Sequence, residues 1–265
     1  MVFDLHLILL PVFGFLIGAF VTTIGGGGGV FYVPVLTLFF DISTQLAVAT
    51  SLAAVLPTTI MGALSHHRLG HVNIRLGLIF GIGGVAGTLF GVYMANKIPS
   101  ILLRKIFGIF LLIMTVPMII NALKRRKKSY KENESVKLTS KKAFLGSFFG
   151  VVSGTMAGLF GISGTPPVTA GLYIFGLPAV AVVGTSLFVL TFNAVSGLSG
   201  YYLLGQFNLT LIILLGGGGA LGAFIAPYIV KRINEQTIEK IYAPLLVSLN
   251  LIISFAMILY IKKKI

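Results

Sequence analysis

The sequence predicts an all-α polytopic membrane protein with about eight transmembrane helices, arranged as two four-helix repeats that each open with a glycine-rich broken or re-entrant segment. Three observations lead to this fold class. The 265-residue chain is 56% hydrophobic and only 10% charged, with a mean hydropathy of +1.01, which is far outside the usual composition of soluble domains. Apolar segments follow one another along its length, and the second half resembles the first.

The helices expected from the apolar segments follow in this order: residues 5–21, 30–40, 45–64, 74–95, 101–123, 143–160, 168–175, 179–204, 209–230 and 238–261. A helix needs about 20 residues to cross a hydrocarbon core of about 30 Å. Segments 30–40 and 168–175 are too short for that, so each is expected to be half of a broken or re-entrant element. Segment 5–21 follows no basic leader and no cleavage site, and is expected to be the first span rather than a signal peptide.

The expected organisation is a first membrane repeat over residues 1–123, a basic connection over 124–142 and a second membrane repeat over 143–265. Nine lysines and arginines lie in the connection, and the net charge of the chain is +14. Positive loops face the cytoplasm, so this placement indicates membrane orientation and anionic lipid contact rather than nucleic-acid binding. With four net crossings per half, both termini of this multi-pass plasma-membrane protein are expected to lie in the cytoplasm. Five crossings per half, which would give an inverted repeat, stay open as the alternative.

Identical residues recur between the two halves in the same order. Near the start of each half the matching pairs are Gly14 and Gly146, Gly29 and Gly161, and Pro34 and Pro166. After a short insertion in the second half they are Thr50 and Thr185, Ser51 and Ser186, and Asn73 and Asn208. So many matches in nearly one register indicate a duplicated unit.

Ionisable side chains avoid the centres of the apolar segments. The acidic residues are Asp4, Asp41, Glu132, Glu134, Glu235 and Glu239, all near segment ends or in connections. Intramembrane charges usually mark ion pathways, so the sequence argues against a carboxylate proton relay, a carboxylate-lined cation pathway and a carboxylate metal cage. Histidines and arginines gather at 66–75, where interfacial anchors are expected and a vestibule for anions is the alternative. No metal site and no cofactor are predicted.

Residues 22–37, TTIGGGGGVFYVPVLT, contain the strongest local signal. Consecutive glycines interrupt a membrane helix, because each costs about 1 kcal/mol against alanine and the freed backbone groups have no water to bond. A glycine loop that enters a short helix presents unpaired N–H groups and the positive end of the helix dipole, which favour an anion. A weaker copy over 158–164 precedes Pro166 and Pro167. A nucleotide phosphate loop is not expected, because the Lys-Ser/Thr ending is missing.

Hydroxyl and amide groups supply the other polar candidates within the spans. The Thr-Ser pairs at 50–51 and 185–186 recur at equivalent repeat positions, although single hydroxyls often bond only their own helix. Asn193 falls in mid-span, where an amide is costly and needs a partner. The residues predicted to bind the substrate are therefore Thr22, Gly25, Gly26, Gly27, Gly28, Gly29, Thr50, Ser51, Ser163, Gly164, Thr165, Thr185, Ser186 and Asn193.

These motifs resemble the TauE/SafE family of sulfite exporters and related permeases. The resemblance rests on the glycine-rich break that ends in Val-Pro-x-Leu, its degenerate copy before Pro166, the repeated Thr-Ser pairs and the Gly-x-x-Asn turns, and it covers residues 14–253. It implies a bacterial or archaeal plasma-membrane carrier of sulfite, sulfonates, sulfoacetate or related small organic anions. The second half departs from the pattern, because Ser163, Gly164 and Thr165 replace continuous glycines.

We therefore expect a secondary transporter or uniporter-like exporter that holds a small anion at the two glycine-rich breaks near the membrane midplane. An inside-negative potential of about 100 mV expels each negative charge with about 2.3 kcal/mol, so export needs no coupling ion. The expected partners are the anion and the lipid bilayer; the oligomeric state is not predicted. The alternatives are a carrier of another solute, such as a metal cation or neutral metabolite, and a non-transporting assembly or scaffold protein. A membrane enzyme is disfavoured, because no nucleophile–base pair lies within a span.

Overall fold

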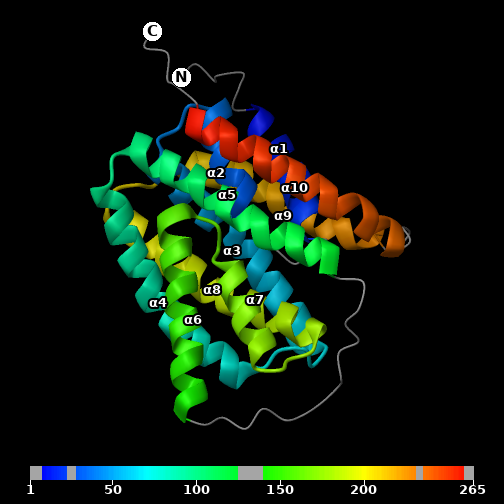
Figure 1. Cartoon of the computed structure of the whole chain (residues 1–265). Helices are drawn as coiled ribbons and strands as arrows, with labels where there is room; N and C mark the ends of the chain where they lie inside the picture. The colour runs from blue at the N-terminus through cyan, green and yellow to red at the C-terminus, as the bar shows by residue number, and fades with distance from the viewer. Residues whose placement is uncertain (1–7, 23–27, 125–139, 231–234, 260–265) are drawn as a thin grey trace.

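The structure, a computed structural model, describes residues 8–22, 28–124, 140–230 and 235–259, and these residues form helices joined by short loops. No strand occurs within these ranges. The helices (Figure 1) are α1 (Leu9–Thr22), α2 (Gly29–Pro34), the π-helix η2 (Val35–Phe39), α3 (Thr44–Arg68), α4 (Ile74–Lys97), α5 (Ser100–Lys124), α6 (Ser140–Phe160), α7 (Thr165–Ile174), α8 (Ala179–Leu203), α9 (Leu209–Val230) and α10 (Glu235–Leu259).

Within the described residues, four helices are long and apolar enough to cross a membrane: α3, α4, α6 from Ala143 and α8 from Val180. Shorter apolar stretches occupy α1, the pair α2 and η2, and parts of α9 and α10. An all-helical chain of this kind fits a membrane protein, because helices satisfy their backbone groups internally in a medium without water.

The first short segment folds back along the helix that precedes it. Phe31 of α2 packs edge-on against Phe20 of α1, with 5.8 Å between ring centroids. Further along, Phe39 of η2 lies 5.5 Å from Phe13 of α1. The eleven residues of α2 and η2 rise only about 16 Å, which is half of a bilayer core. They therefore form a helical hairpin with α1.

The second short segment, α7, returns along α6 in the same way. Gly164, directly before α7, packs so closely on Ser153 of α6 that a side chain there would overlap the Ser153 backbone carbonyl. Further along α7, a Cβ on Gly171 would lie 2.9 Å from the Phe149 ring of α6. Both halves thus open with a hairpin, which is the geometry of a re-entrant element.

Helices that the sequence repeat pairs with one another run in opposite directions. Near one end of the α3–α8 pair, Gly62 packs against Leu187, and near the other end Gly197 packs against Leu52. α5 and α10 are also side by side and antiparallel, as Figure 1 shows. The two halves therefore have inverted orientations.

This arrangement corrects the preference for four net crossings per half. Because α2 and η2 return toward the end of the molecule where α1 begins, α3, α4 and α5 remain as lengthwise passages of the first half. The start of α1 and the end of α5 consequently lie at opposite ends of the bundle. The cytoplasmic placement of the termini stays a prediction.

Each hairpin packs on the opposite half. α6 lies along α4 and α1 lies along α9, and these are the most extensive helix contacts in the described structure (Figure 1). Glycines let the backbones touch: Cβ atoms on Gly83 and Gly87 of α4 would overlap the carbonyls of Ser147 and Val151 of α6. Such small-residue contacts are the usual basis of close packing between membrane helices. The two halves therefore form one intertwined body.

The structure also shifts the register of the repeat. Gly28 and Gly164 each stand directly before a short helix in the left-handed conformation, with φ of 75° and 74°. The opening hairpins thus correspond through Gly28 and Gly164, whereas the sequence pairing set Gly29 against Gly161. A run of identical glycines can slide against its copy in sequence, whereas the position that caps a helix is set by backbone geometry.

Two clusters of buried apolar side chains form the core. The larger one gathers around α2, α3 and α5 and includes Tyr32, Leu52 and Phe107. The smaller one lies between α4, α7 and α8 and includes Phe80 and Leu172. The hairpin tips lie where these helices converge.

Candidate functional site

The tips of the two hairpins meet inside the protein. Gly29, the first residue of α2, packs so closely on the tip between α6 and α7 that a side chain there would overlap the Gly161 carbonyl. The same carbonyl accepts a hydrogen bond of 2.9 Å from Ser51 Oγ of α3. The start of α2 is thus held directly against the glycine break of the second half, and α3 forms a third wall.

The tip between α6 and α7 has a constrained backbone. Gly161, Ser163 and Gly164 all have positive φ, of 68°, 63° and 74°. For a residue with a side chain this left-handed conformation costs roughly 1–2 kcal/mol, and it persists only where the surroundings impose it. Ser163 is fully buried, so its packing supplies that constraint. Such strain is often found at functional sites, and here it marks the tip as a candidate.

Asn193 of α8 ties the tip to the helices around it. Its Nδ2 donates to Ser153 Oγ of α6 at 3.0 Å and to the Ser163 carbonyl at 3.2 Å. Ser153 Oγ donates in turn to the Gly164 carbonyl at 2.7 Å. We call these four residues, Asn193, Ser153, Ser163 and Gly164, the Asn193 cluster. Asn193 and Ser153 both lie away from the ends of their helices, as does Gly84 of α4, which stands against Asn193 Oδ1.

Four buried polar atoms at predicted residues have no hydrogen-bond partner among the described residues: Thr50 Oγ1, Ser163 Oγ, Ser186 Oγ and Asn193 Oδ1. Each of these side chains is fully buried. An unsatisfied buried polar group costs about 1–3 kcal/mol, so a group of them calls for an explanation. Three of the four atoms are hydroxyls that can donate a hydrogen bond to an incoming acceptor.

The starts of α2 and α7 differ in what they can offer an anion. The Gly28 carbonyl accepts the N–H groups of Phe31 and Tyr32, at 2.9 and 3.1 Å, and closes the first turn of α2. The first turn of α7 contains Pro166 and Pro167, which have no N–H. The break before α7 therefore presents fewer amide donors than we expected from the sequence, and its side-chain hydroxyl gains importance.

Two predicted residues have other roles in this structure. Thr185 Oγ1 accepts a hydrogen bond of 3.0 Å from the Asn73 N–H, at the loop between α3 and α4. Thr165 is the first residue of α7, and its carbonyl accepts from Thr169 Oγ1 at 3.1 Å. Neither residue is hydrogen-bonded to the Asn193 cluster.

Some predicted residues cannot be placed at the tips. Gly25, Gly26 and Gly27 lie outside the described residues, as does the side chain of Thr22 at the end of α1. The described part of the first break is therefore Gly28 and the start of α2.

Sequence reasoning missed Ser153 and Gly84 as parts of the site, and it included Gly161 only as a member of the weaker glycine break over 158–164. Ser153 is one hydroxyl in an apolar helix, and its only signal is that it precedes the second glycine break by a short stretch of the same helix. Gly84 belongs to a glycine run typical of helix packing. Both become recognisable only when α4, α6 and α8 are seen to converge.

The described residues that form this site carry no charge. The acidic residues in the described part are Asp41, before α3, and Glu235 and Glu239, in the first turns of α10. Asn193, Ser153 and Ser163 are neutral, so the cluster acts through hydrogen bonds and backbone dipoles. It can hold a small polar solute without supplying a compensating charge.

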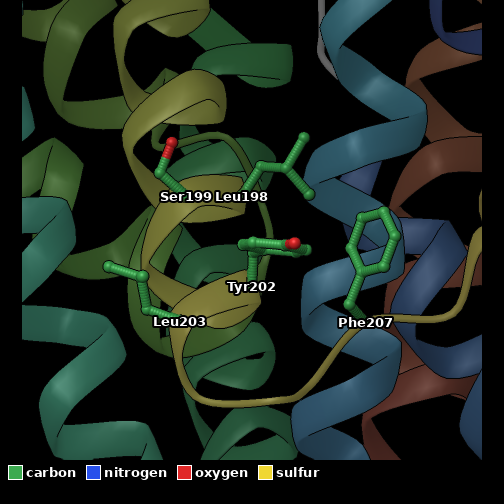
Figure 2. Close-up of a pocket in the computed structure, with 5 residues that line it drawn as sticks. All are labelled: Leu198, Ser199, Tyr202, Leu203 and Phe207. Atoms are coloured by element: carbon green, nitrogen blue, oxygen red, sulfur yellow. The ribbon is translucent and has the colours of Figure 1, made fainter.

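A hollow of about 330 Å³ lies elsewhere, at the end of α8. Figure 2 shows its lining residues, which are Leu198, Ser199, Tyr202, Leu203 and Phe207. The rings of Tyr202 and Phe207 meet edge-on with 5.3 Å between centroids. Because the lining is mostly apolar and carries no charge, this hollow is a poor site for an anion.

Residues 10–253 match the model of the family described as sulfite exporter TauE/SafE. The chain belongs to this family. The match spans α2 to α9 entirely and most of α1 and α10, so both hairpins and the Asn193 cluster lie inside the TauE/SafE region. The sequence-based resemblance is confirmed.

Curated relatives of this TauE/SafE protein carry transporter names. It is 32% identical to "Probable membrane transporter protein YdhB" of Bacillus subtilis (strain 168) over 212 residues, and these residues cover 80% of this chain and 85% of the relative. "Probable membrane transporter protein YunE" of the same organism is 28% identical over 251 residues, 88% of this chain and 92% of the relative. "Probable membrane transporter protein MJ0441" of Methanocaldococcus jannaschii is 31% identical over 205 residues, 75% and 73% of the two chains. No solved structure matches the chain significantly. Together with the apolar helices, the family assigns the chain to the membrane transporters.

Proposed function

We propose that this TauE/SafE protein carries small sulfur-containing or organic anions of the sulfite, sulfonate and sulfoacetate class, as a secondary transporter or uniporter-like exporter. The proposed site is where the two hairpin tips meet, near the membrane midplane. Apart from Thr165 and Thr185, whose other contacts are described above, the predicted substrate-binding residues keep that role in the proposal, and Ser153 joins them.

The observation that carries the proposal is the convergence of two glycine-rich tips, from halves of opposite direction, beside buried hydroxyls without partners among the described residues. Gly29 touches Gly161, and the Asn193 cluster adjoins the same tip. Inverted repeats with discontinuous helices are a recurrent plan of secondary transporters, and their substrates bind where the repeats meet. The description of the family as sulfite exporters supports an oxyanion as the solute.

Neutral donors suit the passage of an anion. Hydroxyl and backbone dipoles stabilise negative charge, yet they hold it less strongly than a buried lysine or arginine would. A carrier must also release its substrate, so moderate binding favours turnover. Ser163 Oγ is the most direct candidate donor, because it is buried at the tip and has no partner among the described residues.

The proposal is tested by removing that hydroxyl. Ser163→Ala deletes no hydrogen bond among the described residues, so a structural role predicts little change. A hydrogen bond to a charged ligand is worth about 1.5–3 kcal/mol, so we expect roughly a tenfold or larger loss of sulfite or sulfonate affinity in proteoliposome flux.

Thr191→Val is the matched control, because Thr191 Oγ1 bonds only the Leu187 carbonyl of its own helix. Flux of this control should stay near wild type. Unchanged affinity in folded Ser163→Ala would remove Ser163 from the site. Absence of flux for every anion tested with the wild-type protein would overturn the substrate class.

A further inference from the structure

Two loops at repeat positions have the same internal geometry. They join α3 to α4 and α8 to α9, and we call them loop A (residues 69–73) and loop B (residues 204–208). Both loops contain a glycine with positive φ, which is 75° at Gly70 and 71° at Gly205. In both, a backbone N–H donates to a backbone carbonyl five residues earlier at 2.9 Å, from His71 to His66 and from Gln206 to Tyr201. In both, an asparagine Oδ1 accepts the N–H of the residue three positions later at 3.1 Å, at Asn73 from Leu76 and at Asn208 from Leu211. Internally, the two loops are copies.

The loops differ in their attachment to the opposite half. In loop A, the Asn73 N–H donates to Thr185 Oγ1 of α8 at 3.0 Å. The repeat counterpart would be a bond from the Asn208 N–H of loop B to Thr50 Oγ1 of α3. That bond is absent, because Thr50 Oγ1 is buried and has no partner among the described residues. Asn208 is exposed, whereas Asn73 is half-buried.

A second pair of repeat positions shows the same imbalance. Ser51 Oγ of α3 donates to the Gly161 carbonyl at 2.9 Å. Its counterpart in α8, Ser186 Oγ, has no partner among the described residues and is fully buried. Both imbalances involve α3 and α8, the antiparallel pair at the centre of the molecule. Each leaves one hydroxyl satisfied and its copy unsatisfied.

We propose that the structure is one of two end states between which loop A and loop B exchange their attachment. In the other state Asn208 donates to Thr50 and Asn73 leaves Thr185. Because α3 and α8 are antiparallel, loop A and loop B lie at opposite ends of the pair, with the Asn193 cluster between them. The exchange would therefore close one end while it opens the other, which is the requirement of alternating access. This inference rests on the proposed transport function.

The surface that receives each loop explains why one state is observed. Loop A packs on Gly184, where a Cβ would lie 2.7 Å from the His71 carbonyl oxygen. The repeat counterpart of Gly184 is Ala49, which carries a methyl group at this position. Loop B must therefore dock slightly farther out, so attachment of loop A is the more stable state. Loop B also borders the hollow at the end of α8, through Phe207 (Figure 2).

The natural chain contains no cysteine, so disulfide trapping needs no further substitution. The first double variant, Asn73→Cys with Thr185→Cys, joins residues whose Asn73 N and Thr185 Oγ1 atoms lie 3.0 Å apart. A disulfide tolerates a Cα separation of up to roughly 7 Å. The second double variant, Asn208→Cys with Thr50→Cys, reports the other state. With copper phenanthroline as the oxidant, in liposomes, we expect the disulfide of the first double variant to form quickly. The disulfide of the second double variant should form more slowly, but to completion.

The control pair, Asn73→Cys with Thr50→Cys, spans opposite ends and should stay reduced. Adding Thr185→Val to the second pair removes the acceptor of loop A, worth about 1 kcal/mol or about fivefold in population, and should speed its cross-linking about fivefold. Adding Gly184→Ala to the second pair should also speed its cross-linking, because the new methyl group weakens the attachment of loop A. A second pair that stays reduced in folded protein, while the first is complete, would overturn the exchange.

Cross-linking needs no substrate, which separates this inference from the proposed function. If both pairs form but no anion is transported, the exchange stands and the substrate class fails. If sulfite is transported and the second pair never forms, the exchange fails and the substrate class stands.

Discussion

Ser163 combines a strained backbone with an unpaired donor. Its φ of 63° is the left-handed conformation that Gly28 and Gly164 adopt directly before the short helices, and its hydroxyl is buried without a described partner. Glycine would satisfy the backbone better, so stability alone does not explain a serine here. The proposed ligand, which would accept its hydrogen bond, would account for the side chain.

Ser163→Gly should therefore separate stability from transport. Relief of the left-handed strain yields about 1–2 kcal/mol, while the added freedom of the unfolded chain costs about 0.5–1 kcal/mol. We expect a net stabilisation of about 0.5–1 kcal/mol together with a loss of substrate affinity. Thermal unfolding followed by circular dichroism measures the first, and proteoliposome flux the second. A destabilised variant with normal flux would contradict the assignment.

Gly164→Ala is the opposite control for the same backbone. Gly164 has φ of 74°, and a Cβ there would overlap the Ser153 carbonyl. This variant should lower both stability and flux, because it adds strain and displaces Ser153 from the cluster.

At the level of elements, the pairing of α4 with α6 positions the second tip. Their backbones are in contact at successive turns, through Gly83, Gly87 and Gly91 of α4. Ser153 lies on α6 within this contact, so the distance between the two helices sets where its hydroxyl meets Asn193. A wider interface would move the tip away from α8.

Gly87→Val should open this interface. A Cβ at Gly87 would overlap the Val151 carbonyl, and overpacking of this kind costs about 1–3 kcal/mol. We expect a lower free energy of unfolding by that amount, measured by thermal unfolding in detergent. Gly217→Val is the matched control from another glycine run, because a Cβ at Gly217 meets nothing within 4 Å. Equal effects of the two variants would mean that helix propensity, not packing, explains the loss.

At the level of the whole molecule, sequence reasoning identified the helices and the duplication signal but not the direction of the halves. Hydropathy and length locate each helix separately, whereas direction depends on whether the short segments cross or return. Contacts such as Phe13 with Phe39 decide that, and no local pattern encodes them. Likewise, the sequence indicated that Asn193 needs a hydrogen-bond partner. It did not indicate that Ser153 is that partner, because α6 and α8 meet only in the folded protein.

The inverted architecture and the neutral site lead to a prediction for the energy source. The Asn193 cluster contains no ionised side chain, so an anion would cross with its charge uncompensated. Each charge that moves through about 100 mV gains or loses about 2.3 kcal/mol. Anion efflux should therefore accelerate under an inside-negative potential and slow under the reverse potential.

Valinomycin and potassium gradients set the potential in proteoliposomes, and sulfite or sulfonate flux is measured in each direction. Efflux of a monoanion should carry a net current of one charge per molecule, and that of a dianion two charges. A flux that ignores the potential would mean that a cation accompanies the anion or that the solute is neutral. The same measurement in Thr191→Val, whose hydroxyl bonds only its own helix, controls for leak caused by altered packing of α8.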